Sequence, residues 1–338
     1  MGAHRAPRVT LGVTTYNVER YLPGALDSLL AQDYQDFEIV ACDNVSTDAT
    51  WDILSAYAEK DARIRIFRNP ENLGEAGNFH RVVSLARGEL FRASAHDDIA
   101  APGLLSACVA ALDANPQAVL AFPSTILIDG DGNEIGPWED QLDLRQGGTA
   151  ARVAKYAQKW NICNEVFGLI RTDVLRQTRM LGPFLSSDVR MLHELALRGE
   201  FVQLPERLFY RRMHATVTFG ADRDTDEVLE WLEPGAAAAS RKKKKRRPAS
   251  SQHHHTKMTW ETTKALLNAD EVPLGRRVEG TAAFLTAWGA RRGRARLGRL
   301  KQAVTGSTSA PPPWERPTSP EPTSPEPTSP DPKPAETS

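Results

Sequence analysis

Two acidic clusters follow short apolar runs in the first hundred residues. Asp97 and Asp98 come just after the largely apolar run 89–93, and Asp43 directly follows the apolar run 37–42. If both runs are parallel strands, their carboxyl ends meet in one crevice. Two adjacent carboxylates stay ionised together only beside a cation, so the pattern indicates a divalent metal ion and the phosphates that it usually accompanies. Either cluster alone is equally compatible with an acidic loop that caps a helix.

The elements around these acids alternate between strand and helix signals. Val9, Leu11 and Val13 predict a strand, and leucines at helical spacing follow at 22–30. A second helix is expected after Asp43, with Ser46 or Thr47 as its N-cap. A third strand near 64–66 and a third helix near 79–83 continue the alternation. This order predicts an α/β fold with a parallel sheet covered by helices on both faces.

Five short motifs, two of which contain these acids, follow one another in a characteristic order. They lie at 9–17, 43–50, 69–74, 86–89 and at the pair 97–98 with the proline at 102. This series resembles the family 2 glycosyltransferases of the GT-A fold, over roughly residues 8–214. The resemblance implies one catalytic domain at 1–220, built on a Rossmann-like, mostly parallel sheet with helices on both faces.

The resemblance also implies a reaction. The donor would be a nucleoside-diphosphate sugar, with a UDP-sugar expected first, and the acceptor a carbohydrate or lipid-linked hydroxyl that attacks with inversion. Mn²⁺ or Mg²⁺ would neutralise the leaving pyrophosphate. The expected metal ligands are Asp97, Asp98 and His214, although His214 is equally compatible with a structural role. The residues expected to bind the nucleotide sugar are Thr14, Thr15, Tyr16, Asn17, Asp43, Asn44, Asn72, Asn78 and Asp97.

By the same resemblance, an acid at the start of a later helix supplies the catalytic base. Asp188 stands at that position, ahead of an apolar helical pattern that would fix its direction. The helix N-terminus would favour its ionised form. Asp188 could instead only cap that helix, and Glu194 is the second candidate for the base.

Two departures from the family pattern are visible. The metal motif usually has an additional acid two residues before the final pair, and this chain has Ala95 there, followed by His96. His96 is therefore a further candidate to orient or ligate the metal. The family also usually has a proline shortly before the Tyr16-Asn17 pair, and in this chain Thr14 takes its place.

Composition adds bounds on the class of protein. The chain has 338 residues, 41% of them hydrophobic, and three cysteines. This length can bury a full core. We expect free thiols, no export signal, no membrane-spanning segment and a cytoplasmic location.

The basic charge is concentrated near the C-terminal end. Residues 240–301 contain 17 Lys and Arg against 4 Asp and Glu, an excess of +13 in a chain whose net charge is −1. We expect a basic linker at 221–257, a helical basic region at 258–306 and a disordered Pro/Thr/Ser/Glu-rich tail at 307–338. The helical region has an apolar stripe with Phe284, Leu285 and Trp288. Such a helix either lies peripherally on the anionic inner face of a membrane or packs against the catalytic domain.

Two other functions remain compatible with the sequence. A nucleotidyltransferase also combines an α/β sheet with acids and a sugar nucleotide, but it would carry a Gly-rich phosphate loop near the first strand, which is missing here. A catalytically inactive scaffold could use the basic run 241–247 to bind nucleic acid or a membrane. We expect no nucleic-acid partner, because a basic run is more often a solvated linker.

Overall fold

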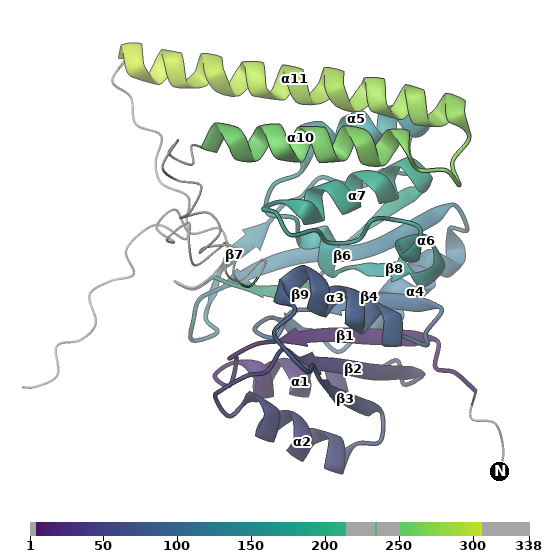
Figure 1. Ribbon diagram of the computed structural model, residues 1–338, viewed down its shortest axis with the longest axis vertical. Coiled ribbons are helices and arrows are strands. Elements are labelled where there is room, and N and C mark those ends of the chain that lie inside the picture. The colour runs from purple at the N-terminus through teal and green to yellow at the C-terminus, as the bar shows by residue number, and fades with distance from the viewer. Residues whose placement is uncertain (1–4, 214–233, 235–250, 306–338) are drawn as a thin grey trace, which may run out of the picture.

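A nine-stranded sheet forms the centre of the protein (Figure 1). The computed structural model describes residues 5–213, 234 and 251–305 of the chain. The strand order is β3-β2-β1-β4-β8-β6-β9-β5, and β7 pairs with β6. The strands are β1 (Val9–Thr15), β2 (Phe37–Asp43), β3 (Ile64–Arg68), β4 (Leu90–Ser94), β5 (Ile99–Ala100), β6 (Ala118–Ile128), β7 (Glu134–Trp138), β8 (Leu169–Arg171) and β9 (Glu200–Arg212).

The N-terminal half of the sheet is parallel, as the alternating pattern predicted. β1 pairs in parallel with β2 on one side and β4 on the other, and β3 continues the sheet beyond β2. The short strand β8 then joins β4 to β6 with antiparallel pairing on both sides. Among the strands of the described chain, six run in one direction and β5, β7 and β8 run in the other. The predicted mostly parallel sheet is therefore confirmed.

Helices cover both faces of this sheet, so the expected layering is confirmed. One buried cluster joins α1, α2 and α4 to one face, and the other joins α3, α5 and α7 to the opposite face. These elements bury almost all of their branched aliphatic side chains, which is the main source of stability. The helices are α1 (Leu22–Leu30), α2 (Thr50–Lys60), α3 (Gly74–Leu85), α4 (Leu104–Ala114), α5 (Thr149–Lys159), the 3₁₀ turn η1 (Asn164–Phe167), α6 (Thr172–Arg176), α7 (Ser187–Arg198), α10 (Ser251–Leu267) and α11 (Leu274–Thr305).

The start of α2 differs from the sequence-based expectation. Ser46 and Thr47 were the predicted N-caps, but the N-cap is Ala49, which has no side-chain cap bond. The Ser46 hydroxyl instead donates to Asp43, and the Asp48 carboxylate accepts the Thr50 N–H at 3.0 Å. The hydroxyls that the local pattern assigned to the helix thus bond elsewhere, Ser46 to Asp43 in the same loop and Thr47 to Asn17 Oδ1 at 3.3 Å.

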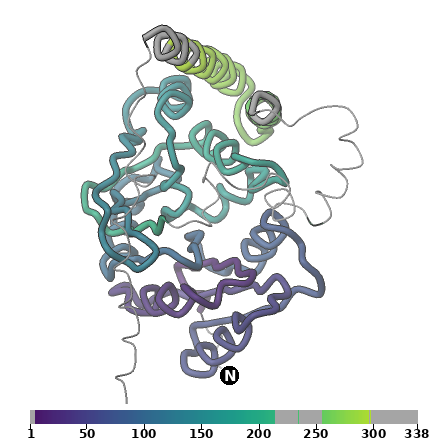
Figure 2. Tube along the Cα trace, turned by 90° about the vertical axis from the view of Figure 1, so that its left-hand side faces the viewer, coloured from purple at the N-terminus to yellow at the C-terminus, as the bar shows by residue number. Residues whose placement is uncertain are grey.

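The C-terminal helices α10 and α11 pack over α5 and α7, on the side of the molecule opposite α1 and α2 (Figure 1, Figure 2). Phe284 is fully buried and Trp288 is 5% exposed, whereas Leu285 remains 45% exposed. The Trp288 ring stacks on Trp160 at a centroid distance of 5.9 Å, and its Nε1 donates to Thr259 Oγ1 at 2.8 Å. Two of the three residues named for a membrane-facing stripe therefore lie inside the protein.

The described part of the chain covers the predicted segments unevenly. Because α10 begins at Ser251, the last residues of the expected linker at 221–257 are helical. The basic run 241–247, His214 and the Pro-rich tail lie outside the described residues. The three cysteines are buried free thiols. None of the helices in the described ranges is long and apolar enough to cross a membrane.

Candidate active site

A pocket opens at the carboxyl ends of β1, β2 and β4, where the strand order changes direction. Ligands of open α/β sheets bind at such a point. Most of the lining residues belong to the set expected to bind a nucleotide sugar, and two others, Glu75 and His96, complete the pocket. The lining residues are Thr14, Thr15, Tyr16, Asn44, Asn72, Glu75, Asn78 and His96.

The loop after β1 presents an aromatic ring to this pocket. Thr15 is 1% exposed and its hydroxyl donates to the Cys42 carbonyl at 3.3 Å, so it mainly joins β1 to β2. Tyr16 is 41% exposed and lines the pocket. Asn17 adopts a positive φ of 54°, and its side chain accepts the Thr47 N–H at 2.8 Å. Asn17 therefore shapes the turn, while Tyr16 is the side chain available to stack on a ligand.

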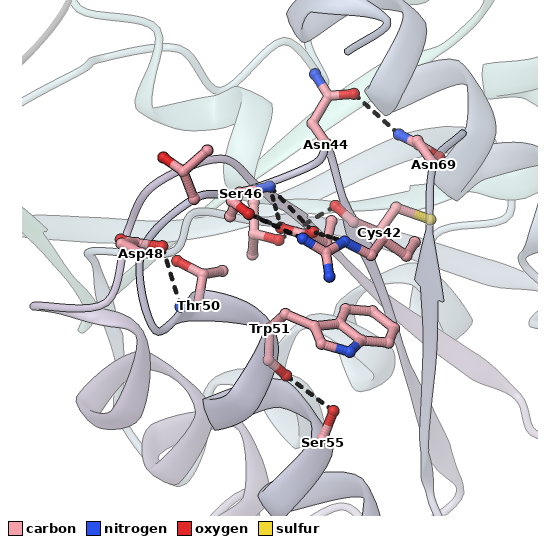
Figure 3. A network of polar contacts seen from close by, with 12 residues as sticks. Cys42, Asn44, Ser46, Asp48, Thr50, Trp51, Ser55 and Asn69 are labelled. Carbon is pink, nitrogen blue, oxygen red and sulfur yellow. Dashed lines mark hydrogen bonds and ion pairs between the residues drawn. The ribbon is translucent and has the colours of Figure 1, made fainter. Parts of the chain in front are cut away.

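A chain of amide side chains lines and supports the pocket, and Figure 3 shows its bond between Asn69 and Asn44. Asn69 Nδ2 donates to Asn44 Oδ1 at 3.0 Å and to Asn78 Oδ1 at 2.9 Å. Asn44 Nδ2 donates to Asn72 Oδ1, and Asn78 Nδ2 donates to the Cys42 carbonyl at 3.0 Å. These amides hold the end of β2, the loop after β3 and the first turns of α3 in one arrangement. Their hydrogen-bonding groups are largely used within the protein.

Asp43, one of the residues expected to bind the nucleotide sugar, ends β2 directly before Asn44 of the pocket lining. Asp43 is fully buried and is not among the residues that line the pocket. Both carboxylate oxygens accept hydrogen bonds from Ser46, and Arg68 Nε lies 3.2 Å from Oδ2. The Arg68 guanidinium also stacks over Trp51 at 5.4 Å. The Asp43 carboxylate is therefore engaged in the loop that follows β2.

The acid pair lies beside the pocket and is oriented by β9. Arg212 donates its backbone N–H to Asp98 Oδ1 and its Nε to the Asp97 carbonyl, each at 2.8 Å. The same guanidinium reaches the carbonyls of Asp129 and Gly130 in the β6–β7 turn at 3.1 Å. Arg212 therefore ties the acid pair to the end of β9 and to the β6–β7 turn.

The electrostatics of the acid pair fit a divalent cation. Burial raises the pKa of Asp98, the Asp97 carboxylate adds to the rise, and Arg211 and the Arg212 N–H oppose it. A bound divalent cation would relieve this repulsion. Within the described ranges no three acidic, histidine or cysteine side chains gather as a metal site. That fits Mg²⁺ or Mn²⁺, which is often held by one or two carboxylates together with substrate phosphates and water.

Asp188 lies in the first turn of α7, as the sequence predicted. Its Oδ1 accepts the Val189 N–H at 2.8 Å, so part of its role is local. Burial raises the pKa of the Asp188 carboxyl, and the Val189 N–H and Arg211 act in the opposite direction. Arg211 Nη1 also donates to Asn164 Oδ1 at 2.7 Å. Arg211 and Arg212 are consecutive residues at the end of β9. This strand end therefore carries both the guanidinium that lowers the pKa of Asp188 and the residue that bonds to the acid pair.

Glu194, the second candidate for the base, is occupied by structure. Its side chain is 3% exposed and accepts the Arg179 N–H at 3.1 Å. Arg190 lies 3.5 Å away and Arg198 4.0 Å away. A carboxylate shared in this way stabilises the packing of α7 and leaves Asp188 as the better candidate.

Three site residues were not assigned by the sequence reasoning. Glu75 carries no signal beyond its place directly after the Asn72-Leu-Gly motif. Arg211 and Arg212 were visible as a basic pair at the end of the domain, but their contacts to the acids depend on the pairing of β5 with β9. The sequence does not show that pairing.

A parallel sheet with a pocket at its switch point and a neighbouring acid pair defines a nucleotide-binding α/β enzyme class. Residues 10–178, half of the chain, match the family model described as Glycosyl transferase family 2, and the chain therefore belongs to this family. It is 32% identical over 135 residues to an uncharacterized glycosyltransferase of Methanocaldococcus jannaschii, covering 39% of this chain and 47% of that protein. It is 24% identical over 223 residues to the chondroitin synthase of Escherichia coli, covering 63% of this chain and 32% of that protein. The chain thus spans about half or less of the length of these two curated relatives.

The fold is also similar to solved structures. TarS residues 1–349 from S. aureus superpose with a TM-score of 0.52 at 17% identity, covering 85% of this chain and 91% of that one. The complex of the same protein with UDP gives a TM-score of 0.53 at 18% identity, with the same coverage. The GT-A fold expected from the sequence is confirmed.

Proposed function

We propose that the chain transfers a sugar from a nucleoside-diphosphate sugar to an acceptor hydroxyl, with inversion at the anomeric carbon. The observation that carries the proposal is the continuity of the site. The pocket runs from Tyr16 across the ends of β1 and β2 to His96, and His96 leads directly into the acid pair. Family membership supports this reaction. We propose a UDP-sugar as donor, since TarS, of the same fold, was solved with UDP and with UDP-GlcNAc.

In this proposal the acid pair receives the diphosphate end of the donor. Asp97 and Asp98 would hold Mn²⁺ or Mg²⁺, with the remaining ligands from phosphate oxygens, water and possible donors beyond the described residues. The ion would supply positive charge where the pyrophosphate leaves. Arg212 orients the Asp98 carboxylate through its backbone N–H and holds the Asp97 backbone through its Nε.

Asp188 is the proposed general base. It would accept the proton of the acceptor hydroxyl as the oxygen attacks the anomeric carbon from the face opposite the leaving group. Burial raises its pKa, which makes the carboxylate a stronger proton acceptor than an exposed aspartate. The acceptor class, a carbohydrate or a lipid-linked hydroxyl, is proposed on the resemblance alone.

The two other functions have less support. A nucleotidyltransferase would share the sheet and the acids, but family membership favours glycosyl transfer. An inactive scaffold would not need a raised pKa on a carboxyl at a helix start or an acid pair that a cation would stabilise. Both features are typical of a catalytic site.

Replacement of Asp188 by asparagine tests the proposal. Asp188→Asn keeps the shape and most hydrogen bonds but removes the proton acceptor. Transfer from the donor found in a screen of UDP-, GDP- and dTDP-sugars with Mn²⁺ should fall by roughly 10²-fold or more, with donor binding nearly unchanged. Asp173→Asn is the matched control, since Asp173 is the acid in the first turn of α6 and is exposed. A variant at 188 that keeps transfer but melts much earlier would show that the residue only caps α7.

A further inference from the structure

A second cavity, the α5–α11 cavity, lies at the opposite edge of the sheet from the candidate active site. Its volume is about 280 Å³, and its walls come from the start of α5, the end of α7, the start of β9 and the first turns of α11. β9 begins at this cavity and ends 13 residues later at Arg212, which bonds to the acid pair. A strand of that length spans roughly 40 Å, so the two cavities are separate sites.

The wall of the α5–α11 cavity contains a buried cation without a counter-ion. Arg152 is 8% exposed and lines the cavity. Its Nε donates to the Ala196 carbonyl at 3.1 Å and its Nη2 to Thr149 Oγ1 at 3.4 Å. No carboxylate in the described part of the chain forms an ion pair with this guanidinium, and burial lowers its pKa. Because buried charges in proteins are normally paired, an anion in the cavity would supply the missing partner.

The start of α5 adds backbone donors to the same cavity. Gly148 is the N-cap of this 11-residue helix, so no side chain caps it, and Gly148 and Thr149 both line the cavity. The Arg152 N–H bonds back to the Gly148 carbonyl at 3.1 Å. The N–H groups of residues 149–151, ahead of it, have no partner within the helix. Helix starts of this kind bind anions through such N–H groups and the helix dipole.

Four other charged side chains line the cavity. Arg198 is already paired with two glutamates. Arg276, an exposed residue in the first turn of α11, lies near Arg152 and adds to the positive charge. Glu200 and Glu279 act on Arg152 in the opposite direction. The cavity therefore combines an anion site with two carboxylates, which can only accept hydrogen bonds, for example from hydroxyl groups.

We infer that the α5–α11 cavity binds a phosphorylated sugar. The phosphate would contact Arg152, Arg276 and the start of α5, since guanidinium and backbone N–H groups are the usual donors to phosphate oxygens. The sugar hydroxyls would donate to Glu200 and Glu279. The volume of about 280 Å³ is close to the lower limit of small-molecule pockets, which suits a ligand as small as a hexose phosphate. Such a ligand bridges α5 and α11 and stabilises the packing of the C-terminal helices.

The test measures the binding of inorganic phosphate, glucose 1-phosphate, glucose 6-phosphate and glucose to the full chain, by calorimetry and by thermal unfolding. The sugar phosphates should bind more tightly than inorganic phosphate, and glucose, which lacks the anion, should not bind. Arg276→Gln changes an exposed residue and should weaken sugar-phosphate binding about tenfold or more. Glu279→Ala should reduce the preference for the sugar phosphates over inorganic phosphate.

A substitution at the N-cap separates ligand binding from protein stability. Gly148 has extended backbone angles, and an added Cβ there meets no atom within 4 Å. Gly148→Asp would place a carboxylate on the N–H groups at the start of α5. This variant should fold at least as stably as the unaltered protein and still bind the sugar phosphates far more weakly. A substitution that only damaged the packing would lower both stability and binding.

The matched control is Arg294→Gln, which replaces an exposed arginine further along α11 and should change nothing. If none of the three phosphates binds, or if Gly148→Asp and Arg276→Gln bind them as well as the unaltered protein does, the inference is wrong. General stabilisation by anions would be equal in all variants and would count against it. If inorganic phosphate binds as tightly as the sugar phosphates, the assignment of a sugar is wrong. No measurement uses a nucleotide sugar, so the result is independent of the proposed function.

Discussion

The packing of α11 on the catalytic domain predicts a large difference between two neighbouring residues. Phe284 is fully buried between α5 and α7, and its ring meets the buried His193 ring at a centroid distance of 4.8 Å. Truncation of a phenylalanine in such a core costs about 3–5 kcal/mol of unfolding free energy. Leu285 is 45% exposed, so Leu285→Ala should cost less than about 1 kcal/mol. Because the two positions are adjacent on the same helix, a difference between the two variants reports the burial of the side chain and not the helix propensity of the residue.

The assay is equilibrium unfolding in urea, followed by circular dichroism and by loss of UDP binding. Phe284→Ala should move the midpoint far below that of Leu285→Ala. Both probes should report the same transition, because Phe284, α7 and the strands β2 and β4 beside the pocket contribute to one buried cluster. Deletion of residues 240–306, which a detached membrane-binding arm would tolerate, should instead expose the core around α7 and abolish stable folding. If both substitutions have equal and small effects on the midpoint, α11 does not pack on the catalytic domain as described. The alternative that α11 is a separate membrane-binding helix would then be favoured.

Three further predictions concern charged groups. Asp98→Asn should abolish the Mn²⁺-dependent part of UDP-sugar binding in a thermal-shift assay, while Asp131→Asn on the exposed β6–β7 turn should leave it unchanged. Arg211→Met should move the acidic limb of the pH–rate profile to higher pH, because Arg211 lowers the pKa of Asp188 and only the ionised base is active; an unmoved limb would exclude this coupling. Burial lowers the pKa of His193 to about 4, below its unfolded value of about 6.5, so the unfolded state takes up the proton first. Stability should therefore fall by roughly 3 kcal/mol as the pH drops from about 6.5 to 4, and His193→Phe should remove that part of the slope in urea titrations.

The features that could be predicted from the sequence are those fixed by local pattern. The alternation of apolar runs placed β1 to β4 and the helices between them, because period and length identify such elements. The same runs placed Asp43, Asn44 and the acid pair at strand ends, and the structure brings most of the expected residues to one pocket.

The features that could not be predicted depend on partners far apart in the chain. The Asp43 carboxylate is occupied because Arg68, 25 residues later, reaches it from the end of β3. The apolar stripe of α11 was equally compatible with a membrane and with a protein surface, since an amphipathic pattern does not identify its partner. Glu75 was not assigned, because its contact with Thr14 depends on the packing of α3 against β1.

The bond between Asp98 and Arg212 also bears on when the site can form during synthesis. The two residues are separated by 114 positions, and β9, which ends at Arg212, pairs with β6 along almost its whole length. Closing so long a loop is entropically unfavourable until many contacts form together, so this pairing is expected late in folding. A nascent chain that ends near residue 178, where the family model also ends, would have its acid motif but nothing to orient it. Competence to bind donor would then appear only after β9 leaves the ribosome, which protects a half-made chain from trapping nucleotide sugar in an unfinished site.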